Sequence, residues 1–207
     1  MRHLLFAGLV FNLMVGCASV PPPKKVNLAD NCYSTMSAIP AFALSVQTEA
    51  ALKKLKPVDY SSLAKCLLTP DGKRTPVALY KFEGISPPAV VKVSLSSSSF
   101  GVLAAKATLL DANFNEISYT GFDKFINRGN TYSADVFINT NTVKYIAVGQ
   151  DDPQVGKSEK QYASISNTLV VPVGLGYFSY TSGKDSVQVR TFTNVGSLLV
   201  TVKPAVS

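Results

Sequence analysis

Residues 91–95 read Val-Lys-Val-Ser-Leu, and this short stretch decides the fold class. Apolar Val91, Val93 and Leu95 alternate with polar Lys92 and Ser94. Because successive side chains of a strand point to opposite faces, this period of two indicates a strand with one face buried.

Strand character continues on both sides of this stretch, from Pro76 to the end of the chain. We predict strands at residues 77–82, 91–95, 102–110, 117–119, 132–138, 143–148, 165–173, 187–192 and 198–202. Residues 111–113 (Asp-Ala-Asn) form a turn. The polar residues 139–142 form another, and we expect the strands on either side of it to pair.

Many short strands without alternating helices indicate a mainly β fold. We predict an antiparallel β-sandwich with jelly-roll-like connections over residues 75–207; a single closed sheet is the alternative. Residues 30–74 form a short N-terminal helical segment. In it, Asn31 or Ser34 caps a helix that Pro40 stops, and residues 45–55 form a second helix that Pro57 ends.

The first residues have the features of an export signal. Arg2 precedes the apolar residues 4–15, a run too short for a membrane-spanning helix, which needs about 20 residues. Residues 13–17 (Leu-Met-Val-Gly-Cys) resemble the bacterial lipobox. This resemblance implies that a signal of residues 1–16 is cleaved and that diacylglycerol is attached to the sulfur of Cys17. An ordinary secretory signal is the alternative.

Residues 17–29 are expected to be a lipidated tether. Pro21, Pro22 and Pro23 favour polyproline geometry, which extends about 3.1 Å per residue. Several acyl chains would hold such a protein firmly on its membrane. By analogy with lipoprotein sorting, Ala18 in place of Asp favours the periplasmic face of the outer membrane.

The cysteine and histidine inventory limits the chemistry. Cys32 and Cys66 form an even pair in an oxidising compartment, where a disulfide persists; two unpaired buried thiols are the alternative. The only histidine, His3, lies in the signal, so the mature chain lacks the imidazole base of Ser–His–Asp and Cys–His sites. We therefore expect no enzyme, no catalytic residue, no cofactor and no metal.

Three groups of polar residues are the candidates for catalysis or metal binding. Asp151 and Asp152 are adjacent carboxylates, which glycosidases use in pairs, but solvated turn residues are the simpler interpretation. The alternating oxygen donors at residues 111, 113 and 115 suggest a calcium loop, but an Asx turn is simpler because no Glu closes the loop. The four serines at 96–99 are read as a loop.

Residues 173–180 contain the strongest candidate contact surface. Tyr177, Phe178 and Tyr180 follow two glycines, and exposed aromatic clusters often mark binding surfaces. If exposed, these rings would stack on sugars or pack on a partner protein. The alternative is a strand whose side chains alternate between buried and exposed.

One portion of the chain resembles the maltose operon periplasmic protein family. A strand runs into an Asp–Asn turn at residues 107–114, and Lys-Tyr-Ile-Ala-Val at 144–148 precedes the polar residues 150–152. A glycine-bearing loop follows at 174–180. The resemblance covers about residues 75–203 and implies an accessory envelope β-domain linked to maltodextrin uptake, with no catalytic residues.

These features together predict a non-catalytic lipoprotein. The mature charge of +6 (19 basic minus 13 acidic residues) is scattered along the chain, so we expect no nucleic-acid partner. The expected partners are the membrane, through the lipid, and either a glucan or an envelope protein. The first hypothesis is an accessory to carbohydrate uptake or binding, and the second is a structural subunit of an envelope complex such as a secretion or export machine.

Overall fold

Strand β5 (Ala89–Ser96) lies in the middle of one sheet, where its buried residues alternate with half-buried ones. The buried face consists of Ala89, Val91, Val93 and Leu95. The computed structural model describes residues 31–97, 101–174 and 176–205, and in it β5 belongs to one of two sheets that enclose a common core. The predicted fold class, a mainly β antiparallel sandwich, is confirmed.

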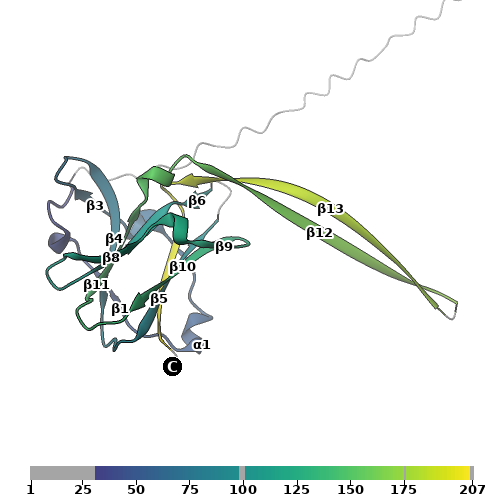
Figure 1. The fold of residues 1–207 in the computed structure, drawn as a ribbon, viewed down its shortest axis with the longest axis horizontal. Coiled ribbons are helices and arrows are strands. Elements are labelled where there is room, and N and C mark those ends of the chain that lie inside the picture. Colours follow the sequence, from purple (N-terminus) through teal and green to yellow (C-terminus); the bar gives the residue numbers. More distant parts are fainter. Residues whose placement is uncertain (1–30, 98–100, 175, 206–207) are drawn as a thin grey trace, which may run out of the picture.

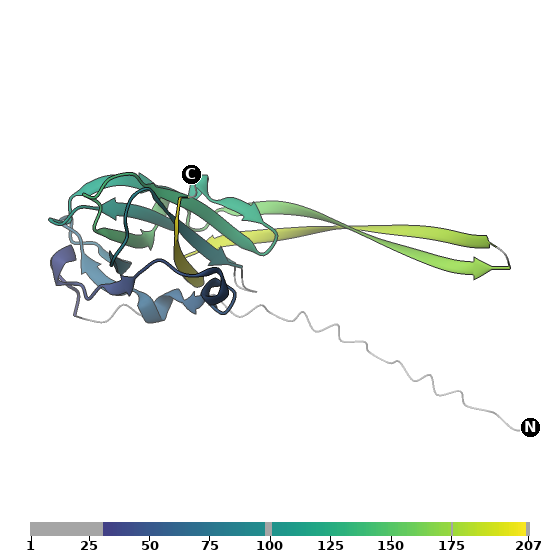
Figure 2. The same ribbon diagram turned by 90° about the horizontal axis from the view of Figure 1, so that it is seen from below.

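The two sheets lie face to face (Figures 1 and 2). One runs in the order β2 (Val58–Asp59), β14 (Ser197–Pro204), β5, β10 (Thr131–Ile138) and β9 (Ile126–Arg128). The other runs β1 (Phe42–Leu44), β4 (Arg74–Phe82), β11 (Tyr145–Gln150), β7 (Ala105–Leu110) and β8 (Glu116–Thr120), with β3 (Lys65–Leu68) also paired to β4. Apolar side chains from both inner faces fill the space between them.

A third, smaller sheet leaves the sandwich as a long hairpin. It consists of β12 (Ser158–Val173), β13 (Gly176–Thr193) and β6 (Val102–Leu103). The strand predicted at 102–110 is divided between β6 and β7. At the break, the N–H of Ala104 donates to the carbonyl of Thr193 at 2.8 Å. The carbonyl of Ala104 accepts the N–H of Asp151, also at 2.8 Å.

The predicted hairpin across residues 139–142 is wrong. Strand β10 pairs with β5 and β9, whereas β11 pairs with β4 and β7. The chain therefore crosses from one sheet to the other at this point instead of turning back within one sheet. The apolar faces of β10 and β11 meet across the core, so each strand buries its apolar side chains without pairing with the other.

The N-terminal segment contains short helices and also strands of both sheets. Its helices are η1 (Met36–Ala38), α1 (Glu49–Leu52) and α2 (Tyr60–Leu63), and η2 (Phe122–Lys124) and η3 (Asp152–Gln154) occur later. The helix expected over residues 45–55 is shortened to α1, whose N–H at Ala51 is capped by Thr48. Strands β1 and β3 extend one sheet and β2 extends the other.

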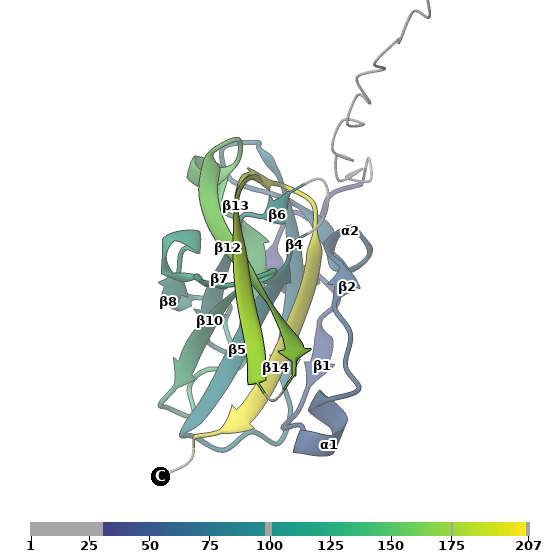
Figure 3. The same ribbon diagram turned by 90° about the vertical axis from the view of Figure 1, so that its right-hand side faces the viewer.

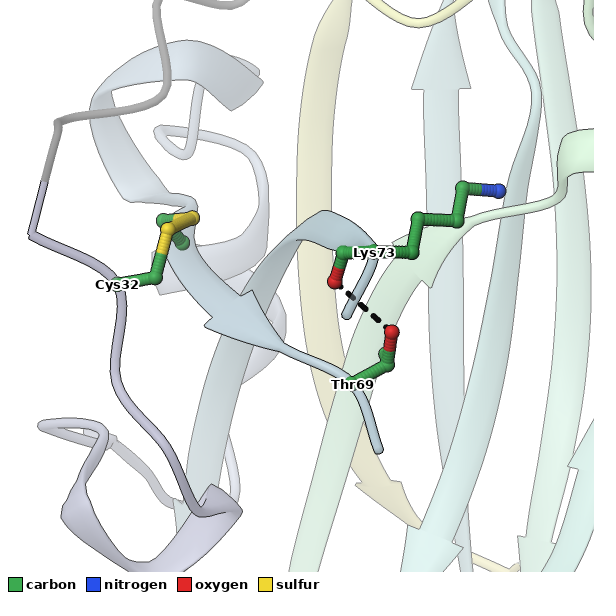
Figure 4. The surroundings of a disulfide bond; sticks show 4 residues. Cys32, Thr69 and Lys73 are labelled. Carbon is green, nitrogen blue, oxygen red and sulfur yellow. Dashed lines mark hydrogen bonds between the residues drawn. A yellow bond between two sulfur atoms is a disulfide. The ribbon is translucent and has the colours of Figure 1, made fainter. Parts of the chain in front are cut away.

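A disulfide joins Cys32 to Cys66 on β3, with the two Cα atoms 4.6 Å apart (Figure 4). Beside it, the N–H of Tyr33 bonds to the carbonyl of Cys66, and the N–H of Leu68 to the carbonyl of Tyr33, both at 2.8 Å. The turn after β3 is closed by Thr69, whose hydroxyl donates to the carbonyl of Lys73 at 2.8 Å. These bonds attach the start of the described chain to the sandwich.

Several predictions concern residues that the structure does not describe. The signal at 1–16, the lipidation site Cys17 and the tether at 17–29 all lie outside the described residues, as do Ser98 and Ser99 of the serine run.

Candidate functional site

The hairpin of β12 and β13 is the most distinctive surface of the molecule. It extends far beyond the sandwich (Figures 1 and 2), and in the end-on view its two strands lie in front of the body (Figure 3). Its ladder runs from Ser158 opposite Thr191 to Val173 opposite Gly176. Gly174 enters the two-residue turn with φ +63°, a conformation that glycine adopts without strain. We call the paired residues 158–173 and 176–191 the arm.

The far end of the arm is apolar and exposed. We define the arm tip as residues 169–174 and 176–180. Its exposed apolar side chains are Leu169, Val170, Val171, Val173, Tyr177, Phe178 and Tyr180. From Ser166 to Gly183 the sequence contains no charged residue. A continuous uncharged apolar surface of this kind is typical of a contact site for another molecule.

The three aromatic residues singled out in the sequence lie in this tip. Tyr177, Phe178 and Tyr180 are 81%, 59% and 59% exposed. They belong to a strand, as the alternative interpretation held, but neither face of that strand is buried. A two-stranded ribbon with no second layer behind it leaves both of its faces in water.

At the base of the arm, a polar network joins β12 to the sandwich. Its centre is the hydroxyl of buried Tyr132 on β10, which donates to Glu159 Oε2 at 2.9 Å. The same hydroxyl accepts from Gln161 Nε2 at 2.8 Å and from Asn127 Nδ2 at 3.3 Å. Burial raises the pKa of Tyr132, so the phenol keeps its proton and its donor role at neutral pH.

Beside this network lies an open groove of about 550 Å³, which we call the basal groove. Its lining residues are Asn127, Gly129, Asn130, Glu159, Lys160, Gln161, Tyr162, Gln188 and Arg190. Arg190 is only 8% exposed, and its Nη2 donates to Asn130 Oδ1 at 2.8 Å. Its Nη1 and the Oδ1 of Asn127 are buried and have no hydrogen-bond partner among the described residues. These two atoms lie beneath the surface of the groove, while its other amide and carboxylate side chains line the open space.

The adjacent acids Asp151 and Asp152 do not face a common space. Asp151 Oδ2 accepts the backbone N–H of Phe122 at 2.8 Å, which holds η2 against the chain. Asp152 forms an ion pair with Lys73 and accepts from the side chain of Gln150 at 2.5 Å. Both carboxylates thus hold loops together.

The Asp111 loop is an Asx turn. Asp111 Oδ1 accepts the N–H groups of Asn113 and Asn115 at 2.7 and 2.8 Å, and Oδ2 accepts from the Asn115 side chain at 3.0 Å. These bonds, led by the one from the Asn115 side chain, lower the pKa of Asp111. Within residues 31–97, 101–174 and 176–205, no three His, Cys, Asp or Glu side chains gather as metal ligands would.

The sequence pattern indicated the aromatic tip but missed the basal groove. The groove draws its residues from β9, the turn that follows β9 and the two strands of the arm, which lie far apart in the sequence. Each of its Asn, Gln and Glu residues looks like ordinary solvated surface in the sequence. Only the pairing of the strands brings them together.

Comparison with known proteins leaves the chain without a family assignment. No protein-family model, no curated protein and no solved structure matches it. In the part of the chain that the structure describes, no helix has the length and apolar character needed to cross a bilayer.

Proposed function

We propose that this protein is a non-catalytic, lipid-anchored assembly subunit of the cell envelope, and that the arm tip is the surface through which it contacts its partner. The observation that carries the proposal is the exposure of a charge-free apolar tip at the end of a hairpin that projects from the body.

The physical reason is that the arm has little to stabilise it alone. An isolated two-stranded hairpin is at best marginally stable in water, and a sheet usually needs a third strand or a packed layer. Strand β6 pairs with β13 at Phe192 and Thr193, at the base of the arm. A partner that covers the tip would bury apolar surface worth about 25 cal/mol per Å² and would order the arm.

The proposed location rests on the sequence of the first residues. Lipid on Cys17 would hold the chain at the periplasmic face of the outer membrane, and the proline-rich tether would keep the sandwich off the lipid surface. In this arrangement the arm is free to reach a membrane-bound neighbour.

The test is recovery of partners from detergent-solubilised outer membrane with the protein as bait. Replacing the tip rings, Phe178→Ser with Tyr180→Ser, is expected to reduce partner recovery at least tenfold. The matched control is Ile126→Ser with Phe137→Ser, since these residues of the body are 59% and 60% exposed. Equal losses with both variants, or recovery of no partner chain of any kind, would count against the proposal.

A second candidate function, accessory binding in carbohydrate uptake, is favoured by the basal groove. Sugars are recognised by planar polar side chains together with an aromatic ring, and the groove supplies amides, Glu159, Arg190 and the exposed ring of Tyr162. A sugar hydroxyl both donates and accepts, so it matches the amides of Gln161 and Gln188 and the carboxylate of Glu159 that line the groove. The resemblance to the maltose operon family points to glucans.

Isothermal titration with maltodextrins tests this second function. We expect measurable heat with the parent protein and at least tenfold weaker binding for Tyr162→Ala. The control is Tyr119→Ala, which removes another exposed tyrosine ring, on β8 and away from the groove. Absence of heat with every maltodextrin would remove glucan binding from consideration.

A further inference from the structure

The two long edges of the arm differ in how they can pair. In the antiparallel ladder, rungs alternate between hydrogen-bonded pairs and pairs whose backbone groups point outward. The two-residue turn makes Val173 and Gly176 a hydrogen-bonded pair, so even-numbered residues of β12 and odd-numbered residues of β13 point outward. The base of the arm shows the same pattern. Thr193 is an odd-numbered residue of β13, and its carbonyl points outward, toward β6, where it accepts the N–H of Ala104.

The edge of β12 carries a proline near the tip. Pro172 lies opposite Tyr177, at an outward-pointing rung, so the donor that proline lacks is missing from the edge itself. Proline at such a position is a common way to prevent another strand from pairing. Beyond β6, the edge of β13 has no proline.

Gly183, in the middle of β13, has no explanation within its own chain. It is not in the left-handed region, and a Cβ added there would meet no atom within 4 Å. Glycine weakens a strand interior, and in such a position it often marks the close approach of another backbone. The open space beside Gly183 is on the arm, away from the sandwich.

The side chains on one face of β13 form a self-complementary pattern about Gly183. Tyr177 lies six residues before it and Val189 six after, and both are exposed. Closer to the centre, Ser179 lies four residues before Gly183 and exposed Val187 lies four residues after it. When two such strands run antiparallel, each aromatic end lies against the β-branched end of the other, a favourable cross-strand pair.

The charge along β13 permits a second copy as the partner. The whole protein is basic, with formal charge +7 over its full sequence, so two copies repel over most of their surface. Residues 176–189 of β13 contain one lysine and one aspartate and carry no net charge, so two copies can approach along this strand at little electrostatic cost.

We propose that β13 of one copy pairs antiparallel with β13 of a second copy, with Gly183 opposite Gly183 at a two-fold axis. This inference rests on the proposed function of the arm as a contact element and names its partner. Because β12 is the blocked edge of each arm, pairing through β13 closes the dimer and leaves no open edge for a third copy. The result is a four-stranded ribbon that links two sandwiches.

The first test is cross-linking at the axis. Facing residues of a hydrogen-bonded pair have Cα atoms about 5.5 Å apart, within the range of a disulfide. In protein carrying Cys17→Ser, Gly183→Cys is expected to give a dimer band of twice the mass on a nonreducing gel after mild oxidation. The control is Ser166→Cys, which lies on the same rung at the other edge and is expected to stay monomeric.

The second test blocks each edge in turn. Thr168 and Thr181 share one rung, and their hydroxyl groups lie 2.9 Å apart, so proline at either position loses the same side-chain bond. In sedimentation experiments, Thr181→Pro is expected to abolish the dimer, while Thr168→Pro retains it. Equal effects of the two variants would overturn the choice of edge.

A failure of this inference can be told apart from a failure of the proposed function. A parent protein that stays monomeric and gives no Gly183→Cys dimer would overturn self-pairing. If its tip rings were still needed to recover another envelope protein, arm-mediated assembly would stand. If the tip variant changed neither mass nor recovery, both would fall.

Discussion

At the scale of single residues, Tyr60 connects three elements through one hydroxyl group. It comes from the N-terminal segment, where α2 begins, and is fully buried in the main core. Its hydroxyl donates to the carbonyl of Pro76 on β4 at 2.7 Å and to that of Val148 on β11 at 3.1 Å. One phenol thus connects the segment to two strands of the sandwich.

We predict that Tyr60→Phe lowers the free energy of unfolding by about 1–3 kcal/mol, since it removes the hydroxyl and leaves buried carbonyls less satisfied. Urea unfolding at pH 7 measures the change. Tyr119→Phe is the control, because Tyr119 is exposed and its hydroxyl is expected to contribute little. A loss below that of the control would contradict the structural role of this hydroxyl.

The buried phenols also set an alkaline limit to stability. Burial raises the pKa of Tyr60 far above its usual value of 10, and raises the pKa of Tyr80 to about 12. The folded protein therefore holds these protons at a pH where the unfolded chain releases them, so stability is complete below pH 10 and falls as the pH rises above it. We expect a shallower alkaline decline in Tyr60→Phe; identical slopes for variant and parent would count against this.

At the scale of elements, the N-terminal segment is attached to the sandwich by covalent and backbone bonds together. The disulfide closes a loop between residues 34 positions apart, and the bridge between Tyr33 and Leu67 continues the attachment along β3. Strand β3 in turn pairs with β4, which lies inside its sheet.

We predict that Cys32→Ser with Cys66→Ser lowers the free energy of unfolding by about 3–4 kcal/mol, because the unfolded chain regains the conformational entropy that the closed loop removes. Unfolding of parent and variant in urea, without reductant, measures the difference. Thiol labelling of the unreduced parent at either cysteine would show that the bond does not form in the purified protein.

The pairing of elements was the part of the fold that the sequence predicted least well. The alternation in β5 was read correctly, and strands were correctly predicted at β10, β11 and β14. The predicted pairing of β10 with β11 was wrong because a polar turn between two strands fits both a hairpin and a crossing between sheets. The length of the arm was also missed, since its middle is polar and carries no alternating pattern.

At the scale of the whole molecule, the proposed organisation has three parts: a lipid anchor, a sandwich and a projecting arm. Replacing Cys17→Ser is expected to move the protein from the membrane fraction to the soluble fraction, because the acyl chains that hold it would be absent. Fractionation followed by immunoblotting measures this. Persistence in the membrane fraction would contradict lipid anchoring at Cys17.

The sequence by itself determined the β character of the chain, the face of β5 that enters the core, and the cysteines available to pair. These follow from local geometry, because alternation along one strand depends only on that strand. The tertiary structure alone decided which strands pair, that the aromatic tip is exposed on both faces, and that Arg190 and Asn127 share a groove. These depend on contacts between distant segments, and many pairings are compatible with the same local patterns.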